Sequence, residues 1–484
     1  MTKSAIILVT KQENVAGNVT VSLGLLKNIL GGNITMKLKK YLTIALSAVM
    51  ATVALTGCSS SSNDSSSDDT GSVYYLSFKP EQEEQWKKVA KTYEDETGVK
   101  VKVVTAASGK YEETLKSEIA KDDAPTLFQI NGPVGYQNWK EYTADLKDTD
   151  LYKHLLNEDL AIKDGDGVYG IPYVEEGYGI IYNQSIMDKY FALDGAKVKS
   201  MDEINNFDKL KEVAEDMQSK KDQLGIDGVF ASTSLAPGED WRWQTHLANL
   251  PVYYEFKTNN VDLTSDQTKT ITFQYSDNFK NIFDLYLNNS TIEPSKTGTK
   301  TVNDSMAEFA LEKCAMVQNG NWAWGQVAGV DGNKVLAENV KYLPIYTGVE
   351  GEESQGLCTG TENFFCINAK ASEAEQKAAA DFIYWLYSST TGKDFVTNKL
   401  GFIAPFDTFE ENEKPTDPLA KEVLNWMSKD GVTSVAWNFT LFPSQTFKDN
   451  FGSALLQYAQ GTKTWEEVKT QVVNDWASES VAAE

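Results

Sequence analysis

Arginine and histidine are nearly absent from this chain of 484 residues. Arg242 is the only arginine, and His154 and His246 are the only histidines. Two histidines supply little for a Ser-His-Asp triad, and the sequence has no G-x-S-x-G, H-E-x-x-H or P-loop motif. We therefore expect no enzyme of these classes, no catalytic residues and no cofactor.

Cysteine is also scarce, with four residues and no C-x-x-C spacing. This pattern argues against a zinc site or a disulfide framework, and no metal site is predicted. Cys358 and Cys366 could pair across a loop, although buried free thiols are the expected state.

Positive charge and long apolar runs are both in short supply. Lysine and arginine number 45 against 69 acidic residues, which gives a net charge of −24. This excess argues against nucleic acid or anionic lipid as a partner. The uncharged run Tyr41 to Leu55 is shorter than the roughly 20 residues that span a bilayer.

That run belongs to a segment with the layout of a secretory signal. Met36-Lys37-Leu38-Lys39-Lys40 is basic, and Leu55-Thr56-Gly57-Cys58 follows the apolar run. The segment resembles a bacterial lipoprotein signal, which implies cleavage before Cys58 and a lipid on its sulfur. We expect residues 1–35 to be a mis-called extension, 36–57 the signal peptide, and 58–72 a disordered tether.

Strands and helices alternate where folded sequence begins. Apolar, β-rich runs at 73–78, 99–105 and 126–130 enclose helical patterns at 83–96 and 111–121. This order predicts an α/β protein with a parallel sheet covered by helices. The length suffices for two or three domains.

Loops after strand ends are candidate binding segments in such a sheet. Lys79 and Glu81 follow the first strand, and Asn131 follows the third. Ordinary turn chemistry is the alternative for these loops.

Tryptophans supply the other candidates. An apolar strand, Cys314 to Val317, precedes a polar turn and then Trp322 and Trp324. An indole beside polar groups suits a sugar ring, and core packing is the alternative.

In Trp241-Arg242-Trp243 the guanidinium could be held for paired hydrogen bonds, or could pack in the core beside Glu239 or Asp240. Trp437 could cap a cleft or pack.

Several motifs occur in the order of a known family. The pattern E-x-W-x-x-V-A-x-x-Y-E-x-E-T-G-V-x-V at 84–101 precedes D-A-P-T-L-F, Y-G-I-P, I-Y-N and N-G-x-W-A-W. Together they resemble the carbohydrate-type extracellular solute-binding proteins (family 1) of ABC importers, which are maltose-binding-protein-like. The resemblance covers about residues 73–476. It implies a two-lobe periplasmic-binding-protein-like fold of type II, with interleaved lobes joined by three hinge crossovers.

The resemblance also implies boundaries and roles. Lobe 1 is expected at 73–175 plus 346–404, and lobe 2 at 176–345 plus 405–484. The crossovers are expected at 173–183, 343–345 and 401–405. Trp322 matches the sugar-stacking tryptophan, Glu176 matches a sugar-bonding glutamate, and Glu362 is expected near the cleft.

The function implied is capture of an oligosaccharide between the lobes and its delivery to ABC transporter permease subunits. We expect a monomer at the extracellular face of the cytoplasmic membrane of a Gram-positive-type bacterium, attached only through the lipid on Cys58. One alternative is a surface-anchored glycoside hydrolase. Its carboxylate pairs would be Glu175/Glu176 or Glu239/Asp240, but adjacent strand residues point to opposite faces. Another alternative is a binding protein for a peptide or a polyamine, which acidic cleft residues would suit.

Overall fold

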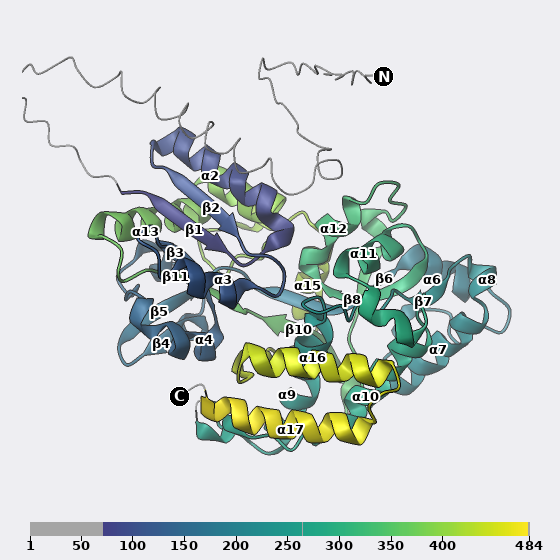
Figure 1. The fold of residues 1–484 in the computed structure, drawn as a ribbon. Coiled ribbons are helices and arrows are strands. Elements are labelled where there is room, and N and C mark those ends of the chain that lie inside the picture. Colours follow the sequence, from purple (N-terminus) through teal and green to yellow (C-terminus); the bar gives the residue numbers. More distant parts are fainter. Residues whose placement is uncertain (1–70, 264, 483–484) are drawn as a thin grey trace, which may run out of the picture. The chain divides into compact units, whose positions relative to one another are not determined.

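The computed structural model describes residues 71–263 and 265–482 (Figure 1). The predicted extension, the signal peptide, the lipid anchor at Cys58 and nearly all of the tether lie outside these residues. Within the described ranges, no helix is both long enough and apolar enough to cross a membrane.

The first of two sheets has six strands in the order β2-β1-β3-β11-β5-β4. β1 pairs in parallel with β2 and β3, which confirms the predicted alternation, whereas β11 runs antiparallel to β3 and β5. We call this sheet with its helices the first lobe. Its strands are β1 (Val73–Ser77), β2 (Val101–Thr105), β3 (Leu127–Asn131), β4 (Ile162–Asp164), β5 (Gly167–Pro172) and β11 (Asn363–Ile367).

Helices cover both faces of this sheet because its strands alternate apolar side chains between two cores. Tyr75 of β1 packs with residues of α2 and α13, and Leu76 packs on the other face with residues of α3 and α4. Full burial of an aliphatic side chain such as that of Leu76 contributes roughly 1.5–3 kcal/mol. The helices of the first lobe are α2 (Glu83–Thr97), α3 (Tyr111–Glu118), α4 (Gly132–Trp139), α5 (Asp150–Lys153), α13 (Glu373–Ser388) and α14 (Thr390–Asp394).

The second sheet has the order β12-β10-β6-β8-β7, and β9 also pairs with β6. The central strand β6 runs antiparallel to β8, β9 and β10, and all its residues are buried. We call this sheet with its helices the second lobe. Its strands are β6 (Glu176–Asn183), β7 (Gly228–Phe230), β8 (Cys314–Gly320), β9 (Val340–Leu343), β10 (Gln355–Gly360) and β12 (Thr433–Ala436).

Most of the helices in the described part of the chain belong to this second lobe. α16 and α17 pack along each other beside α9 and α10 (Figure 1). The helices are α6 (Gln184–Phe191), α7 (Phe207–Ser219), α8 (Lys221–Leu224), α9 (Ala248–Thr258), α10 (Ser276–Asn288), α11 (Val302–Ala310), α12 (Trp324–Ala328), α15 (Pro418–Met427), α16 (Gln445–Ala459) and α17 (Trp465–Ala482).

Three connections join the lobes, and they lie next to one another. The first leads from β5 into β6, which begins at Glu176. The second leads from β10 to β11, and Gly360 at the end of β10 pairs with Glu176. The third passes through Ile403, which forms a bridge with Glu175. The three crossovers therefore form one narrow hinge region.

The second crossover does not lie where the sequence predicts it. We expected it at residues 343–345, but the chain continues from β9 into β10, which pairs with β6 and β12 in the second sheet. Residues 355–360 therefore join the second sheet rather than lobe 1. The prediction fails because the partners of β10 are distant in sequence. The other lobe boundaries remain a proposal.

Cys358 and Cys366 lie on β10 and β11, in different sheets. Both are buried free thiols, as is Cys314, which confirms the expected state.

Candidate functional site

A cavity of about 320 Å³ lies between the two lobes. The first lobe lines it with residues that follow its strands and with the start of α3. The second lobe lines it with residues of β6, α11, α12 and α16 and of the segments around residues 240 and 322. The polar side chains concerned are Lys79, Glu81, Ser108, Tyr111, Glu112, Asn131 and Glu362 from the first lobe, and Glu176, Glu239, Asp240, Gln244, Thr245, His246, Asn303, Gln326, Gln445, Lys448 and Asp449 from the second.

One buried ion pair crosses the cavity between the lobes. Nζ of Lys79 lies 2.8 Å from Oε1 of Glu176 and 3.8 Å from Oε1 of Glu81. Burial alone lowers the pKa of Lys79, but the carboxylates of Glu176 and Glu81 outweigh it and raise that pKa above its ordinary value. Lys79 is therefore a charged lysine whose positive charge is already paired.

The lobes also touch at the rim of the cavity. The hydroxyl of Ser108 donates a 3.3 Å hydrogen bond to the carbonyl oxygen of Gly238. Gly109 has a φ of +66°, and a Cβ there would lie 3.0 Å from Cα of Gly238. Only a glycine allows the two backbones to approach so closely without strain.

Two indoles and an imidazole form an aromatic wall. The rings of Trp241 and Trp322 lie 6.0 Å apart at 48°, and His246 lies 5.0 Å from the first and 5.5 Å from the second. Nζ of Lys79 lies 5.4 Å from the Trp322 ring centroid, within reach of a cation–π contact. Burial lowers the pKa of His246 to about 3, so this ring is neutral at physiological pH.

Trp322 reaches the wall because β8 ends directly before it. β8 continues to Gly320, further than the predicted Val317, and a single 3₁₀ turn, Asn321–Ala323, then carries the indole. The side chain of Trp322 lies directly over Gly320, where a Cβ would overlap its ring. Trp322 and Trp324 pack against different groups of buried side chains, and Trp324 does not line the cavity.

Seven of the nine predicted ligand-binding residues meet in this cavity, and two do not. Arg242 is 1% exposed and lies outside the lining, where its guanidinium donates a hydrogen bond to the hydroxyl of Ser234 and lies 5.0 Å from the Trp241 ring. Trp437 is 8% exposed and packs against Phe439 behind the aromatic wall. The seven are Lys79, Glu81, Asn131, Glu176, Trp241, Trp322 and Glu362.

Two carboxyl groups in the cavity have strongly raised pKa values. Burial raises the pKa of Glu362 to about 7, against the lowering effect of Lys448 and Lys79. Burial raises the pKa of Asp240 to about 7 as well, with further contributions from Asp449 and Glu239. Carboxyl groups perturbed in this way gather at binding and catalytic sites.

Sequence reasoning missed Lys448 and Asp449 of α16 as site residues. Lys448 is 8% exposed and faces Glu362, Glu112 and Asp449, but it forms no ion pair within 4 Å in the described chain. Both residues lie on α16. The hydrophobic periodicity of the sequence predicts this helix, but it does not show which face of the helix meets the first lobe.

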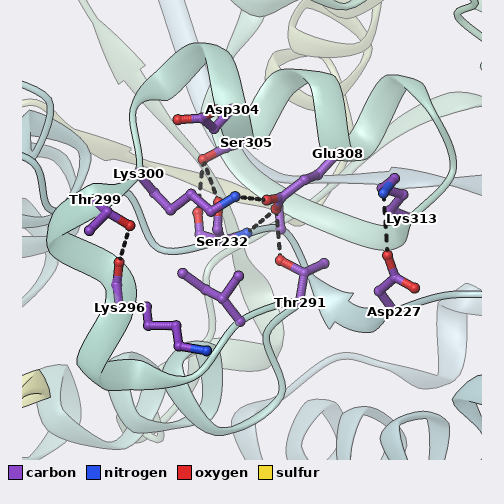
Figure 2. Close-up of polar contacts among 12 residues, drawn as sticks. Asp227, Ser232, Thr291, Lys296, Thr299, Lys300, Asp304, Ser305, Glu308 and Lys313 are labelled. Atoms are coloured by element: carbon purple, nitrogen blue, oxygen red, sulfur yellow. Dashed lines mark hydrogen bonds and ion pairs between the residues drawn. The ribbon is translucent and has the colours of Figure 1, made fainter.

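A buried carboxylate holds one side of the site in place (Figure 2). Glu308 of α11 accepts hydrogen bonds from the backbone amide of Ser232 at 2.7 Å and the hydroxyl of Thr291 at 2.7 Å. Nζ of Lys300 lies 2.9 Å from its other oxygen. These bonds fix α11, whose first residues Val302 and Asn303 line the cavity.

A metal ion has no evident site here. Among the residues that the structure describes, no group of three histidine, cysteine, aspartate or glutamate side chains could hold one.

Known proteins with related sequences bind sugars. The multiple sugar-binding protein of Streptococcus mutans is 22% identical over 426 residues, which is 84% of this chain and 94% of that protein. The melibiose/raffinose/stachyose-binding protein of Bacillus subtilis is 30% identical over 155 residues, which is 31% of this chain and 35% of that protein.

Solved structures show the same fold. A chitin oligosaccharide binding protein matches with a TM-score of 0.64 and 18% identity, over 85% of this chain and all of that chain. A sugar transporter protein of Bacillus licheniformis in complex with stachyose matches with a TM-score of 0.61 and 18% identity, over 84% of this chain and all of that chain. The predicted two-lobe, periplasmic-binding-protein-like fold is thus confirmed.

The family model for bacterial extracellular solute-binding proteins matches residues 88–422, which include parts of both lobes and most of the residues that line the cavity. This chain therefore belongs to the family of bacterial extracellular solute-binding proteins.

Proposed function

We propose that this protein captures an oligosaccharide in the cavity between its lobes and delivers it to the permease of an ABC transporter. The observation that carries the proposal is the aromatic wall of Trp241 and Trp322 beside buried carboxylates. An indole offers an apolar face to the C–H groups of a sugar ring, while carboxylates and amides accept hydrogen bonds from its hydroxyls. The sugar-binding relatives support the same ligand class.

Capture would use the hinge. The three crossovers lie together at Glu175, Glu176 and Gly360, so the lobes can rotate about one region while each sheet stays intact. A ligand that contacts both walls of the cavity binds the closed arrangement better and therefore shifts the population toward it.

The proposal includes the location that the sequence predicts. Cleavage before Cys58 and a lipid on its sulfur would hold the protein at the outer face of the cytoplasmic membrane, where a solute is handed to a permease. The family is one of solute-binding proteins, and we propose that the ligand leaves the cavity chemically unchanged.

Titration calorimetry with oligosaccharides tests the proposal. We expect a one-to-one heat of binding with at least one member of a panel containing raffinose, stachyose, maltose oligomers and chitin oligomers. Chromatography of the recovered sugar should show no shortened product. Hydrolysis of the sugar, or binding of peptides in place of every sugar, would contradict the proposal.

A further inference from the structure

Acidic side chains outnumber basic ones in the lining of the cavity. Seven carboxylate side chains line it, against two lysines. The carboxylates are those of Glu81, Glu112, Glu176, Glu239, Asp240, Glu362 and Asp449. A neutral sugar needs acceptors for its hydroxyls, but it does not need several uncompensated negative charges within one small space, because like charges repel strongly where water is scarce.

The two lysines pair with only some of these carboxyl groups. Nζ of Lys79 is already bound to Glu176 at 2.8 Å, with Glu81 at 3.8 Å. Among the described residues that line the cavity, Lys448 is the only other lysine, and it lies beside Glu362, Glu112 and Asp449. One lysine cannot pair with all the carboxyl groups that remain, and two of them, Glu362 and Asp240, hold part of their charge back because burial raises their pKa to about 7.

Asp240 has the least compensation. It is 6% exposed and lines the cavity, and its own backbone amide donates a hydrogen bond to its carboxylate. Among the described residues, no other side chain forms a hydrogen bond or an ion pair with that carboxylate. Arg242 acts on it only at longer range, while Asp449 and Glu239 add to its negative surroundings. A buried carboxylate whose only donor is its own amide is poorly compensated, so a cation that arrives with the ligand would gain affinity by binding here.

The backbone makes room for this carboxylate. Gly452 of α16 faces Asp240, and a Cβ at that position would overlap the carboxylate oxygen. Trp241 is the next residue in the chain after Asp240, and its indole lines the same cavity. A sugar ring on the indole would therefore place its substituents close to the acid.

We propose that the ligand is an amino-sugar oligomer, an oligosaccharide whose ring carries a primary ammonium group that binds at Asp240, with Glu239 and Asp449 nearby. This inference rests on the proposed function and deepens it by naming the substrate class. Ammonium groups also occur in linear polyamines, which lack a ring to stack on Trp241 and Trp322.

Calorimetry with four probes tests the inference on the purified protein. The probes are glucosamine oligomers of two to four residues, their N-acetylated counterparts, glucose oligomers of the same length and linkage, and spermidine. We expect the glucosamine oligomers to bind about tenfold or more tightly than the N-acetylated ones, since acetylation removes the positive charge. Added salt should weaken binding of the charged oligomers more than that of the neutral ones.

Variants locate the ammonium group. In Asp240→Asn the advantage of the glucosamine oligomer over its N-acetylated counterpart should shrink about tenfold. Asp148→Asn, which changes an exposed carboxylate outside the cavity, should leave the ratio as it is. Thermal unfolding of both variants shows whether each is folded.

Each contrary result has its own meaning. Equal or tighter binding of the neutral oligomers would overturn the inference and leave the proposed function standing. Binding of spermidine and of no oligosaccharide would overturn both the substrate class and the proposed function. Binding of none of the four probes would also overturn the inference.

Discussion

Nζ of Lys79 and Oε1 of Glu176 lie 2.8 Å apart and join the two lobes in the lining of the cavity. Lys79 follows β1 of the first sheet, and Glu176 begins β6 of the second, directly at the hinge. Both side chains are more than nine-tenths buried. The pair that the sequence predicts as two ligand-binding residues is therefore also a direct bond between the lobes.

Replacing Glu176 by glutamine should destabilise the folded protein. The change leaves the Lys79 ammonium buried without its main partner, and breaking a buried pair in this way costs about 3–5 kcal/mol. Thermal or denaturant unfolding measures the effect. Asp95→Asn is the matched control, because its pair with Lys91 is exposed and contributes at most about 1 kcal/mol. If Glu176→Gln lost no more stability than the control variant, Glu81 would be able to replace Glu176 as the partner of Lys79.

Removing the indole of Trp322 should weaken ligand binding more than folding. Trp322→Ala takes away one side of the aromatic wall, and central aromatic anchors of a binding site contribute about 2 kcal/mol or more, which is roughly thirtyfold in affinity. Calorimetry with the bound oligosaccharide measures it. Trp324→Ala provides the comparison, since that indole packs outside the cavity. Equal affinity losses in the two variants would contradict the role of Trp322.

The strand ends of the first lobe could be predicted because strand–helix–strand alternation fixes where loops fall. Lys79 and Asn131 follow β1 and β3 in the structure as they do in the sequence pattern. Glu362 and Glu176 came from family motifs rather than from periodicity. All four line the cavity.

Other parts of the site depend on packing between distant segments. Arg242 is buried behind Trp241, and the neighbouring sequence alone does not distinguish it from a residue that reaches the ligand. Lys448 enters the site because α16 packs against the helical segment Arg242–Leu247. The misplaced second crossover has the same origin, since β10 joins the second sheet through β12, which comes much later in the chain.

Stability should depend on pH through Asp240. Burial raises the pKa of Asp240 to about 7, whereas an unfolded aspartate has a pKa of about 3.9. Between these values the folded protein holds a proton that the unfolded chain has released, so the free energy of unfolding falls as pH rises from about 4 through about 7. Unfolding midpoints measured at pH 4.5 and pH 8 should therefore change less in Asp240→Asn than in the original protein. Identical pH profiles for the two proteins would show that Asp240 is ionised at both pH values.

The network around Glu308 should matter for folding rather than for ligand chemistry (Figure 2). Glu308→Gln removes the charge that Lys300 pairs with at 2.9 Å and places an amide nitrogen near donors that need an acceptor. Since a buried donor left without an acceptor costs about 1–3 kcal/mol, the free energy of unfolding should fall by at least that amount.

The same region offers a control for this prediction. Asp227 and Lys313 form a pair at 3.6 Å with both side chains more than half exposed, so Asp227→Asn should change stability by less than about 1 kcal/mol. Denaturant unfolding of the two variants side by side measures the difference. A loss in Glu308→Gln equal to that in Asp227→Asn would mean that the hydrogen bonds of Glu308 do not fix α11. A larger loss, with ligand affinity retained in the folded fraction, would show that α11 is held in place by burial of this one carboxylate and not by the ligand.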